Sequence, residues 1–324
     1  MEQMKLHLVR LLNIHAVSGH EEPVRDYLHS LLINMLDTVH IDSYGNLLGE
    51  KRCGSGQGAT VLLSAHMDTI TGVPDIKYLN EENGIITAEL PNGSQTALGA
   101  DDRAGIAIIL KVLRNALFDG ILKVAFTVKE EVGRKGSNNI SLDFFNDIDL
   151  AIVVDRRGSR DIVTCCSGMA FCSNEVGHFM ENVSKSIGMD WVCIEGGISD
   201  ACTYAQHGVN TVNLSAGYMH EHTNKEFVSI SDMEDTVKLI LQTLTLINEH
   251  SHRFSSVPEE NKWMQEFVEM DRIYEEGVWG EVFDPNGDVY IYEIDGTCII
   301  QQGSKEIAIE RRNLRNFIDQ IKNA

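Results

Sequence analysis

Acidic and imidazole side chains follow the apolar segments of this 324-residue chain, in positions where a metal-dependent active site could form. They come directly after four short apolar runs, or in the loop between the first two: His66 and Asp68, Asp101 and Asp102, Glu130 and Glu131, Asp155, and His220 and His222. Carboxylate oxygens and imidazole nitrogens together suit Zn²⁺, Co²⁺ or Mn²⁺. The residue types therefore indicate a site for a divalent metal ion.

Each of these pieces alone is a weak signal. With 48 acids in the chain, about seven adjacent acid pairs are expected by chance, so Asp101-Asp102 or Glu130-Glu131 alone would be a solvated charge pair. A lone His-x-Asp, such as His66 to Asp68, would be a surface imidazole oriented by its neighbour. Acids that converge on one edge of a sheet, however, repel each other unless a cation neutralises them. Their common position therefore favours a metal site.

The elements that position these residues alternate between short apolar runs and helical patterns. Helical spacing predicts helices at 4–12, 21–35, 104–117 and 233–247, the second after a Ser18-x-x-Glu21 capping-box pattern. Apolar runs predict strands at 41–44, 59–64, 124–128, 150–154 and 209–214. This order is typical of an α/β fold with a mostly parallel, mixed sheet flanked by helices. In such a sheet ligands bind beyond the carboxyl ends of the strands, where the polar residues are expected.

The sequence changes character after about residue 255. Ser255-Ser256-Val257-Pro258 resembles a linker, and strand-like runs follow at 289–294 and 297–301 with a final helix near 312–321. We therefore predict a catalytic domain at 1–254 and a small α+β appendage at 255–324, in which no residue pattern indicates chemistry.

Composition excludes several classes of function. The net charge of -21 opposes binding to nucleic acid or to an anionic membrane. No apolar run is long enough to span a bilayer, and the amino-terminal segment lacks a signal-peptide pattern. Seven cysteines without a CxxC pair indicate free thiols in a reducing compartment. We therefore expect a cytoplasmic protein.

Across about residues 5–250 the sequence resembles the cocatalytic dinuclear zinc exopeptidases. The motifs that carry the resemblance are SGHEEPVRDYL, SAHMDT, LGADDRAGIA, TVKEEVGRKGS, VVD, EGGISDACTYAQHGVNTVNLSAG and HTNKEFVSI. Some members of the superfamily carry an inserted lid domain of about 100 residues. Only 32 residues separate Asp68 from Asp101, and only 40 separate Asp155 from Gly196, so we expect no inserted lid. The chain is similar to the lidless leucyl-aminopeptidase type, although its HTNKEFVSI segment resembles peptidase T and carboxypeptidase G2.

The resemblance implies two divalent metal ions, zinc in the first place, with cobalt or manganese as alternatives. The implied roles are as follows: His66 and Asp155 hold one ion, Glu131 and His222 hold the other, Asp101 bridges both, Glu130 is the general base, and Asp68 accepts the second ring N–H of His66. A cis peptide between Asp101 and Asp102 is also implied.

Three local assignments have alternatives. His220 lies two residues before His222, and the HTxxE context favours His222. Ser199 and Asp200 match a substrate-binding segment of the family, but a glycine turn with a helix cap would explain them equally well. Glu226 matches a His-x-x-x-Glu pattern and is expected to support its loop.

These features predict a metal-dependent exopeptidase, in particular an aminopeptidase that hydrolyses a peptide or an amino-acid amide. The alternative is an N-acyl amino acid amidohydrolase, in which Arg103, Arg156 or Arg157 would bind the substrate carboxylate. A noncatalytic binding or scaffold homologue is a third alternative, and it would lack a ligand or the base. The sequence leaves self-association open.

Overall fold

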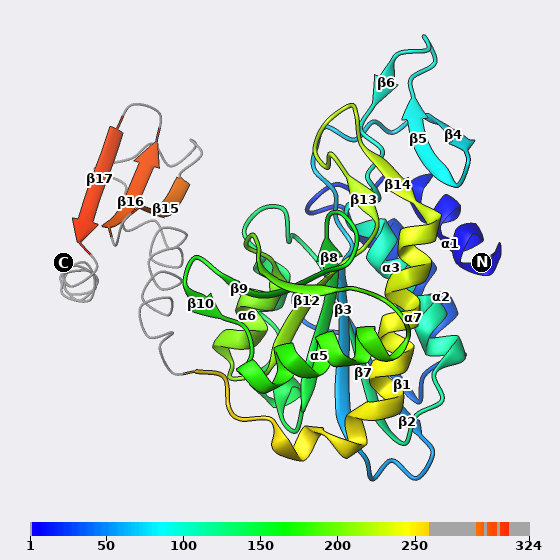
Figure 1. Ribbon diagram of the computed structural model, residues 1–324. Coiled ribbons are helices and arrows are strands. Elements are labelled where there is room, and N and C mark those ends of the chain that lie inside the picture. Colours follow the sequence, from blue (N-terminus) through cyan, green and yellow to red (C-terminus); the bar gives the residue numbers. More distant parts are fainter. Residues whose placement is uncertain (1, 259–289, 295–296, 303–304, 311–324) are drawn as a thin grey trace. The chain divides into compact units, whose positions relative to one another are not determined.

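The computed structural model describes residues 2–258, 290–294, 297–302 and 305–310 (Figure 1). The chain divides into two compact units, Met1–Val257 and Pro258–Ala324, and each is described by itself. The predicted boundary at 254/255 lies three residues before this division.

A nine-stranded mixed sheet forms the centre of the first unit, in the order β1-β2-β7-β3-β8-β12-β9-β10, with β11 paired to β9. Its strands are β1 (Thr38–Ile41), β2 (Leu47–Cys53), β3 (Thr60–His66), β7 (Gly120–Thr127), β8 (Leu150–Arg156), β9 (Asp161–Cys166), β10 (Met169–Ala170), β11 (Val192–Glu195) and β12 (Thr211–Ser215). The four central strands, β7, β3, β8 and β12, run parallel. The predicted mixed α/β sheet with a parallel centre is thus confirmed.

Helices cover the sheet. They are α1 (Glu2–Leu12), α2 (Glu22–Leu32), α3 (Ala100–Asn115), α4 (Lys135–Asn138), α5 (Asn174–Ser186), α6 (Asp200–Gln206) and α7 (Ile230–Leu246), with short 3₁₀ turns at Leu142–Phe145, Ile247–Glu249 and Ser251–Arg253. In the described part of the chain, no helix has both the length and the apolar character that a membrane crossing requires.

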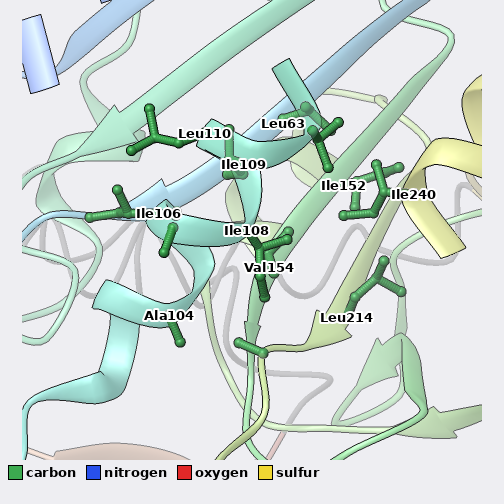
Figure 2. Close-up of a cluster of buried hydrophobic side chains, with 14 of the residues drawn as sticks. Leu63, Ala104, Ile106, Ile108, Ile109, Leu110, Ile152, Val154, Leu214 and Ile240 are labelled. Atoms are coloured by element: carbon green, nitrogen blue, oxygen red, sulfur yellow. The ribbon is translucent and has the colours of Figure 1, made fainter. Parts of the chain in front are cut away.

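The main core lies between helix α3 and the parallel strands. Figure 2 shows Ile108 of α3 beside Val154 of β8, with Leu214 of β12 and Ile240 of α7 in the same cluster. Helix α3 is buried along almost its whole length, which explains its nearly continuous run of apolar residues. On β3, the Ser64 hydroxyl lies 2.7 Å from the hydroxyl of Tyr204 in α6. Since successive strand residues point to opposite faces, and the neighbouring Leu63 belongs to the core cluster, α6 covers the other face.

A second, antiparallel sheet borders the predicted metal site. It consists of β13 (Tyr218–Met219), β14 (Phe227–Ser229), β5 (Ile85–Glu89) and β4 (Tyr78–Glu82), and β6 (Gln95–Thr96) pairs with β5. The segment between Asp68 and Asp101 therefore contributes three short strands to this sheet and holds no lid domain. Because β14 pairs with β5, the sheet fixes the loop between β13 and β14, which contains His222.

Two local predictions are wrong. Ser18 and Glu21 form no capping box, because Ser18 Oγ donates to Asp68 and the Glu21 carboxylate accepts from the backbone of Gly19 and Lys129. The expected strand at 41–44 ends at Ile41 instead. There the Asp42 carboxylate accepts three successive backbone N–H groups, of residues 44, 45 and 46, and the chain turns.

The described part of the second unit is an antiparallel meander of β15 (Tyr290–Ile294), β16 (Thr297–Gln302) and β17 (Lys305–Glu310). The first two strands match the predicted runs at 289–294 and 297–301, and β17 was not predicted. The expected helix at 312–321 lies outside the described residues.

Candidate active site

The predicted site residues lie at the carboxyl edge of the parallel strands. His66 ends β3, Asp155 is the penultimate residue of β8, and Glu130 and Glu131 follow β7. Asp101 enters from the first turn of α3. The structure thus brings the acids and an imidazole together where an open parallel sheet binds ligands.

Asp101 connects the two halves of the site. Its Oδ1 lies 2.9 Å from Nε2 of His66, and its Oδ2 lies 3.3 Å from Nε2 of His222. Nε2 of His66 also lies 3.5 Å from Asp155 Oδ1, and Nε2 of His222 lies 2.9 Å from Glu131 Oε1. Each oxygen of one carboxylate therefore faces a different histidine, and each histidine has its own second carboxylate.

This donor set fits two divalent cations. Oxygen and imidazole nitrogen converge in two groups that share one carboxylate, as expected for a two-metal hydrolase. The carboxylates of Asp101 and Glu131 raise the pKa of His222 to about 10, which measures how strongly this region favours positive charge. Burial raises the pKa of Asp155 to about 7.

The loop that leads into Asp101 is held by Glu226. The Glu226 carboxylate accepts four consecutive backbone N–H groups, those of residues 98–101, at 2.7 to 3.2 Å. Glu226 is only 2% exposed and ends the loop that carries His222. The peptide bond between Asp101 and Asp102 is cis, which confirms the expectation from the resemblance. Glu226 thus supports the backbone that carries Asp101, as its sequence position suggests.

Asp68 organises the opposite side of the site. Nδ1 of His66 lies 3.1 Å from the backbone carbonyl of Asp68 and 3.4 Å from its Oδ1. Oδ1 also accepts the backbone N–H of Glu130 at 3.0 Å. Its Oδ2 accepts the N–H of Glu131 at 3.2 Å and the Ser18 hydroxyl at 2.6 Å. One buried carboxylate therefore orients a histidine and both members of the glutamate pair.

Glu130 lies in the same pocket, and its carboxylate is available for a ligand. Its backbone is fixed by Asp68, but among the described residues no hydrogen bond to its carboxylate is found. Burial raises the pKa of Glu130 well above its ordinary value, and the nearby Asp155 adds to the effect. A carboxylate with a raised proton affinity beside a hydrolytic site is suited to proton transfer.

Asp102 lies close to the site but is engaged elsewhere. Its carboxylate oxygens fall within 4.8 Å of potential ligand atoms of His66 and Asp155. They accept the backbone N–H groups of His66 at 3.3 Å and Gly105 at 3.0 Å. These bonds indicate that Asp102 holds the start of α3 against β3.

A pocket of about 480 Å³ opens over the site. Its wall combines site residues with residues from the loops that follow β8, β11 and β12: Asp101, Glu130, Glu131, Asp155, Arg156, Arg157, Glu195, Gly196, Gly197, Ile198, Asn213, Tyr218, Glu221 and His222. The volume lies in the range of small-molecule sites.

The three arginines differ in their access to this pocket. Arg103 is 1% exposed and donates to the backbone carbonyls of Met67 and Ala16, so it braces the interior. Arg156 and Arg157 line the pocket, and each already has an acidic partner. Arg103 is therefore excluded as a ligand for a substrate carboxylate.

Contacts decide between the alternatives for the site histidine and for Ser199. Both histidines are exposed, but Nε2 of His222 reaches Glu131 and Asp101, whereas the ring of His220 lies 5.8 Å from that of Phe227. Ser199 is the N-cap of α6 and accepts from the backbone of Ala201. These contacts favour His222 as the site histidine, and the helix-cap reading of Ser199.

Asp200 is also turned inward. Its carboxylate accepts the hydroxyls of Thr127 at 2.6 Å and Ser137 at 2.5 Å, and it is 1% exposed. It therefore joins α6 to β7 and α4. In the loop before it, the pocket is lined by Gly196, Gly197 and Ile198.

Sequence reasoning missed several supporting residues. The Tyr218 hydroxyl donates to Asp155 Oδ1 at 3.0 Å, and the Asn213 side chain bonds both the N–H and the C=O of Asp155. Asn213 lies within an apolar strand, which is an unusual position for a polar residue and could have drawn attention to it. Tyr218 carried no comparable signal.

Comparison with known proteins gives consistent relatives. The model of the M42 glutamyl aminopeptidase family matches residues 85–239. A putative aminopeptidase of Acetivibrio thermocellus is 22% identical, over 73% of this chain and 97% of the relative. The aminopeptidase PepT of Bacillus cereus shares the fold, with a TM-score of 0.66 and 17% identity over 75% of this chain and 97% of that protein. A tripeptidase from Staphylococcus aureus has a TM-score of 0.66 and 16% identity, over 76% and 98% of the two chains.

These matches confirm the resemblance to the cocatalytic zinc exopeptidase superfamily that the sequence motifs predict. The family model that matches residues 85–239 is that of the M42 glutamyl aminopeptidases, and the two structural neighbours described above are an aminopeptidase and a tripeptidase. The comparisons thus support a peptidase.

Proposed function

We propose that this protein is a metal-dependent exopeptidase, and specifically an aminopeptidase acting on a peptide or an amino-acid amide. The observation that carries the proposal is Asp101, whose two oxygens face the imidazoles of His66 and His222. The uncommitted Glu130 carboxylate lines the same pocket. This combination provides both the ligands and the base that amide hydrolysis requires.

Two divalent ions would be held by five side chains, with zinc in the first place and cobalt or manganese as alternatives. We assign His66 and Asp155 to one ion, Glu131 and His222 to the other, and Asp101 to both. When bound, the ions would lower the pKa of water and polarise the scissile carbonyl.

Glu130 is assigned the proton transfer. Its carboxylate takes a proton from the attacking water and returns it to the nitrogen of the leaving amine. Asp68 acts through other groups: it holds the backbone of Glu130 and Glu131 and the ring of His66 in their relative positions.

The charged groups favour the aminopeptidase over the amidohydrolase alternative. An N-acyl amino acid would need a guanidinium group for its carboxylate. Arg103 is buried against backbone carbonyls, and Arg156 and Arg157 are paired with Asp161 and Glu221. The noncatalytic alternative expects a missing ligand or base, whereas every expected position is filled.

A matched substrate panel tests the proposal. The purified full-length chain, loaded in turn with zinc, cobalt or manganese, is given amino-acid amides and dipeptides with a free α-amine, and the corresponding N-acetyl amino acids, which keep the free carboxylate. We expect cleavage of the free-amine members alone. Cleavage of the acetylated members alone would establish the amidohydrolase, and cleavage of neither would contradict a peptidase.

A cytoplasmic location is part of the same proposal. Six cysteines among the described residues carry free thiols, as a reducing compartment would maintain them: Cys53, Cys165, Cys166, Cys172, Cys193 and Cys202. The acidic surface also favours a small peptide substrate over nucleic acid.

A further inference from the structure

Glu195 ends strand β11 at an irregularity beside the active-site pocket. Along β11, Ile194 pairs with Val163 of β9, but the next residue, Glu195, pairs with Cys165, so the register shifts by one residue. The extra residue is Thr164 of β9, so the irregularity is a bulge in β9 opposite the end of β11. Glu195 follows this bulge and belongs to the wall of the pocket.

The position of Glu195 is fixed from both sides. Its Oε1 accepts the backbone N–H of Ser167 at 2.9 Å. The following residue, Gly196, donates to the Cys165 carbonyl at 2.9 Å. A Cβ on Gly196 would lie 2.5 Å from Val163, so only glycine allows this close approach of the loop to β9. The carboxylate is therefore held in place before any ligand arrives.

Glu195 differs from the other charged side chains that line the pocket away from the proposed metal ligands. Nη1 of Arg157 lies 2.7 Å from Oε1 of Glu221, and Nε of Arg156 lies 3.2 Å from Oδ2 of Asp161. Within the described ranges, no lysine, arginine or histidine forms an ion pair with Glu195. The pocket thus offers an anchored anion, while its cations are already compensated.

We propose that Glu195 binds the free α-ammonium group of the substrate. The inference rests on the proposed peptidase function and names its substrate class, which is peptides and amides with an unblocked amino terminus. An ammonium group would supply the cation that Glu195 lacks, through a charge-assisted hydrogen bond. Ile198, on the same pocket wall, is 60% exposed and offers an apolar surface for the adjoining side chain.

Two competitive inhibitors that differ only in the amino group test this role. Leucinol carries an α-ammonium group, and 4-methylpentan-1-ol is the same molecule without it. In the Glu195→Gln variant we expect the inhibition constant of leucinol to rise by about 10- to 100-fold, as for a lost charge-assisted bond, and that of the alcohol to stay unchanged. For a free-amine amide substrate, KM should rise by a similar factor, with a smaller change in kcat.

Glu181→Gln is a matched control. The Glu181 carboxylate of α5 also anchors on a backbone N–H of this region, that of Cys193 at 3.0 Å, but it lies outside the active-site pocket. This variant should leave both inhibition constants unchanged. Metal content and thermal unfolding of both variants verify that the site and the fold are intact.

The outcomes distinguish an error in the role of Glu195 from an error in the proposed peptidase function. If the wild type cleaves free-amine substrates, and Glu195→Gln still distinguishes leucinol from the alcohol as the wild type does, the assignment of Glu195 is wrong and the peptidase stands. If the wild type cleaves no amide, the proposed function and this inference both fail.

Discussion

The carboxylate of Glu226 accepts the backbone N–H of Asp101 at 3.2 Å, and the three preceding N–H groups at 2.7 to 2.8 Å. Glu226 ends the loop that carries His222, and Asp101 lies in the first turn of helix α3. One buried side chain therefore joins the two segments whose side chains meet in the site. It sets the position of Asp101 through the backbone N–H of that residue.

Replacing Glu226 should uncouple these segments. Glu226→Ala leaves four backbone donors without their acceptor, and we expect a loss of about 3 kcal/mol or more in the free energy of unfolding. Glu226→Gln keeps the shape but offers only one carbonyl oxygen, so the loss should be about 1 to 3 kcal/mol. Urea unfolding measures both values. Glu82→Gln, on the exposed strand β4, is the control, and an effect of Glu226→Ala no larger than this control would contradict the role.

Substitutions in the two halves of the site should change metal content unequally. Asp101 faces both histidines, whereas Asp155 contacts only one of the two, His66. We expect Asp155→Asn to retain about one metal ion per chain and Asp101→Asn fewer, because a two-metal site depends on its shared ligand. Elemental mass spectrometry after gel filtration gives the values. Equal occupancy in the two variants would argue against a bridging Asp101.

Removal of metal should destabilise the fold. Four carboxylates crowd two imidazoles at the sheet edge, and a bound cation relieves their repulsion. A ligand at 1,000 times its dissociation constant adds about 4 kcal/mol, which corresponds to a thermal midpoint higher by roughly 10 °C in a chain of this size. Calorimetry with and without a chelator measures the shift, and added zinc should restore it. An unchanged midpoint would count against a native metal site.

Removal of the second unit tests whether it contributes to catalysis or to self-association. The division between the compact units falls after Val257, and the Ser255 carbonyl still accepts from Asn210 of the first unit. We therefore expect a chain ending at Val257 to fold and to keep its metal content and turnover. Gel filtration with light scattering gives the number of chains per particle for the truncated protein and for the full chain. Lost turnover or a changed oligomeric mass would assign the second unit a role in catalysis or self-association.

The parts of the site that follow strands could be predicted from sequence. His66 and Asp155 follow apolar runs whose carboxyl ends must meet at one sheet edge, so their proximity depends only on topology. Glu130 and Glu131 follow β7 in the same way. The α/β class was predictable for the same reason, since apolar runs alternate with helical spacing.

The parts that depend on tertiary contacts could not be predicted. Ser18 stands in a sequence pattern typical of a helix cap, but its hydroxyl donates a hydrogen bond to Asp68, fifty residues away. Glu195 lies beside a bulge in β9, and nothing in its neighbouring residues indicates an irregular register. Local patterns describe single elements, whereas these contacts arise between elements distant in the chain.

In the proposed mechanism, Glu130 acts as the base in an intact metal site. The measurement is turnover of a free-amine amide by the wild type and by Glu130→Gln, with metal content determined on the same samples. We expect about two metal ions per chain in both proteins, and turnover reduced by about 10²- to 10⁴-fold in the variant. Unchanged turnover in Glu130→Gln, or no bound metal in the wild type even after reconstitution, would contradict the account.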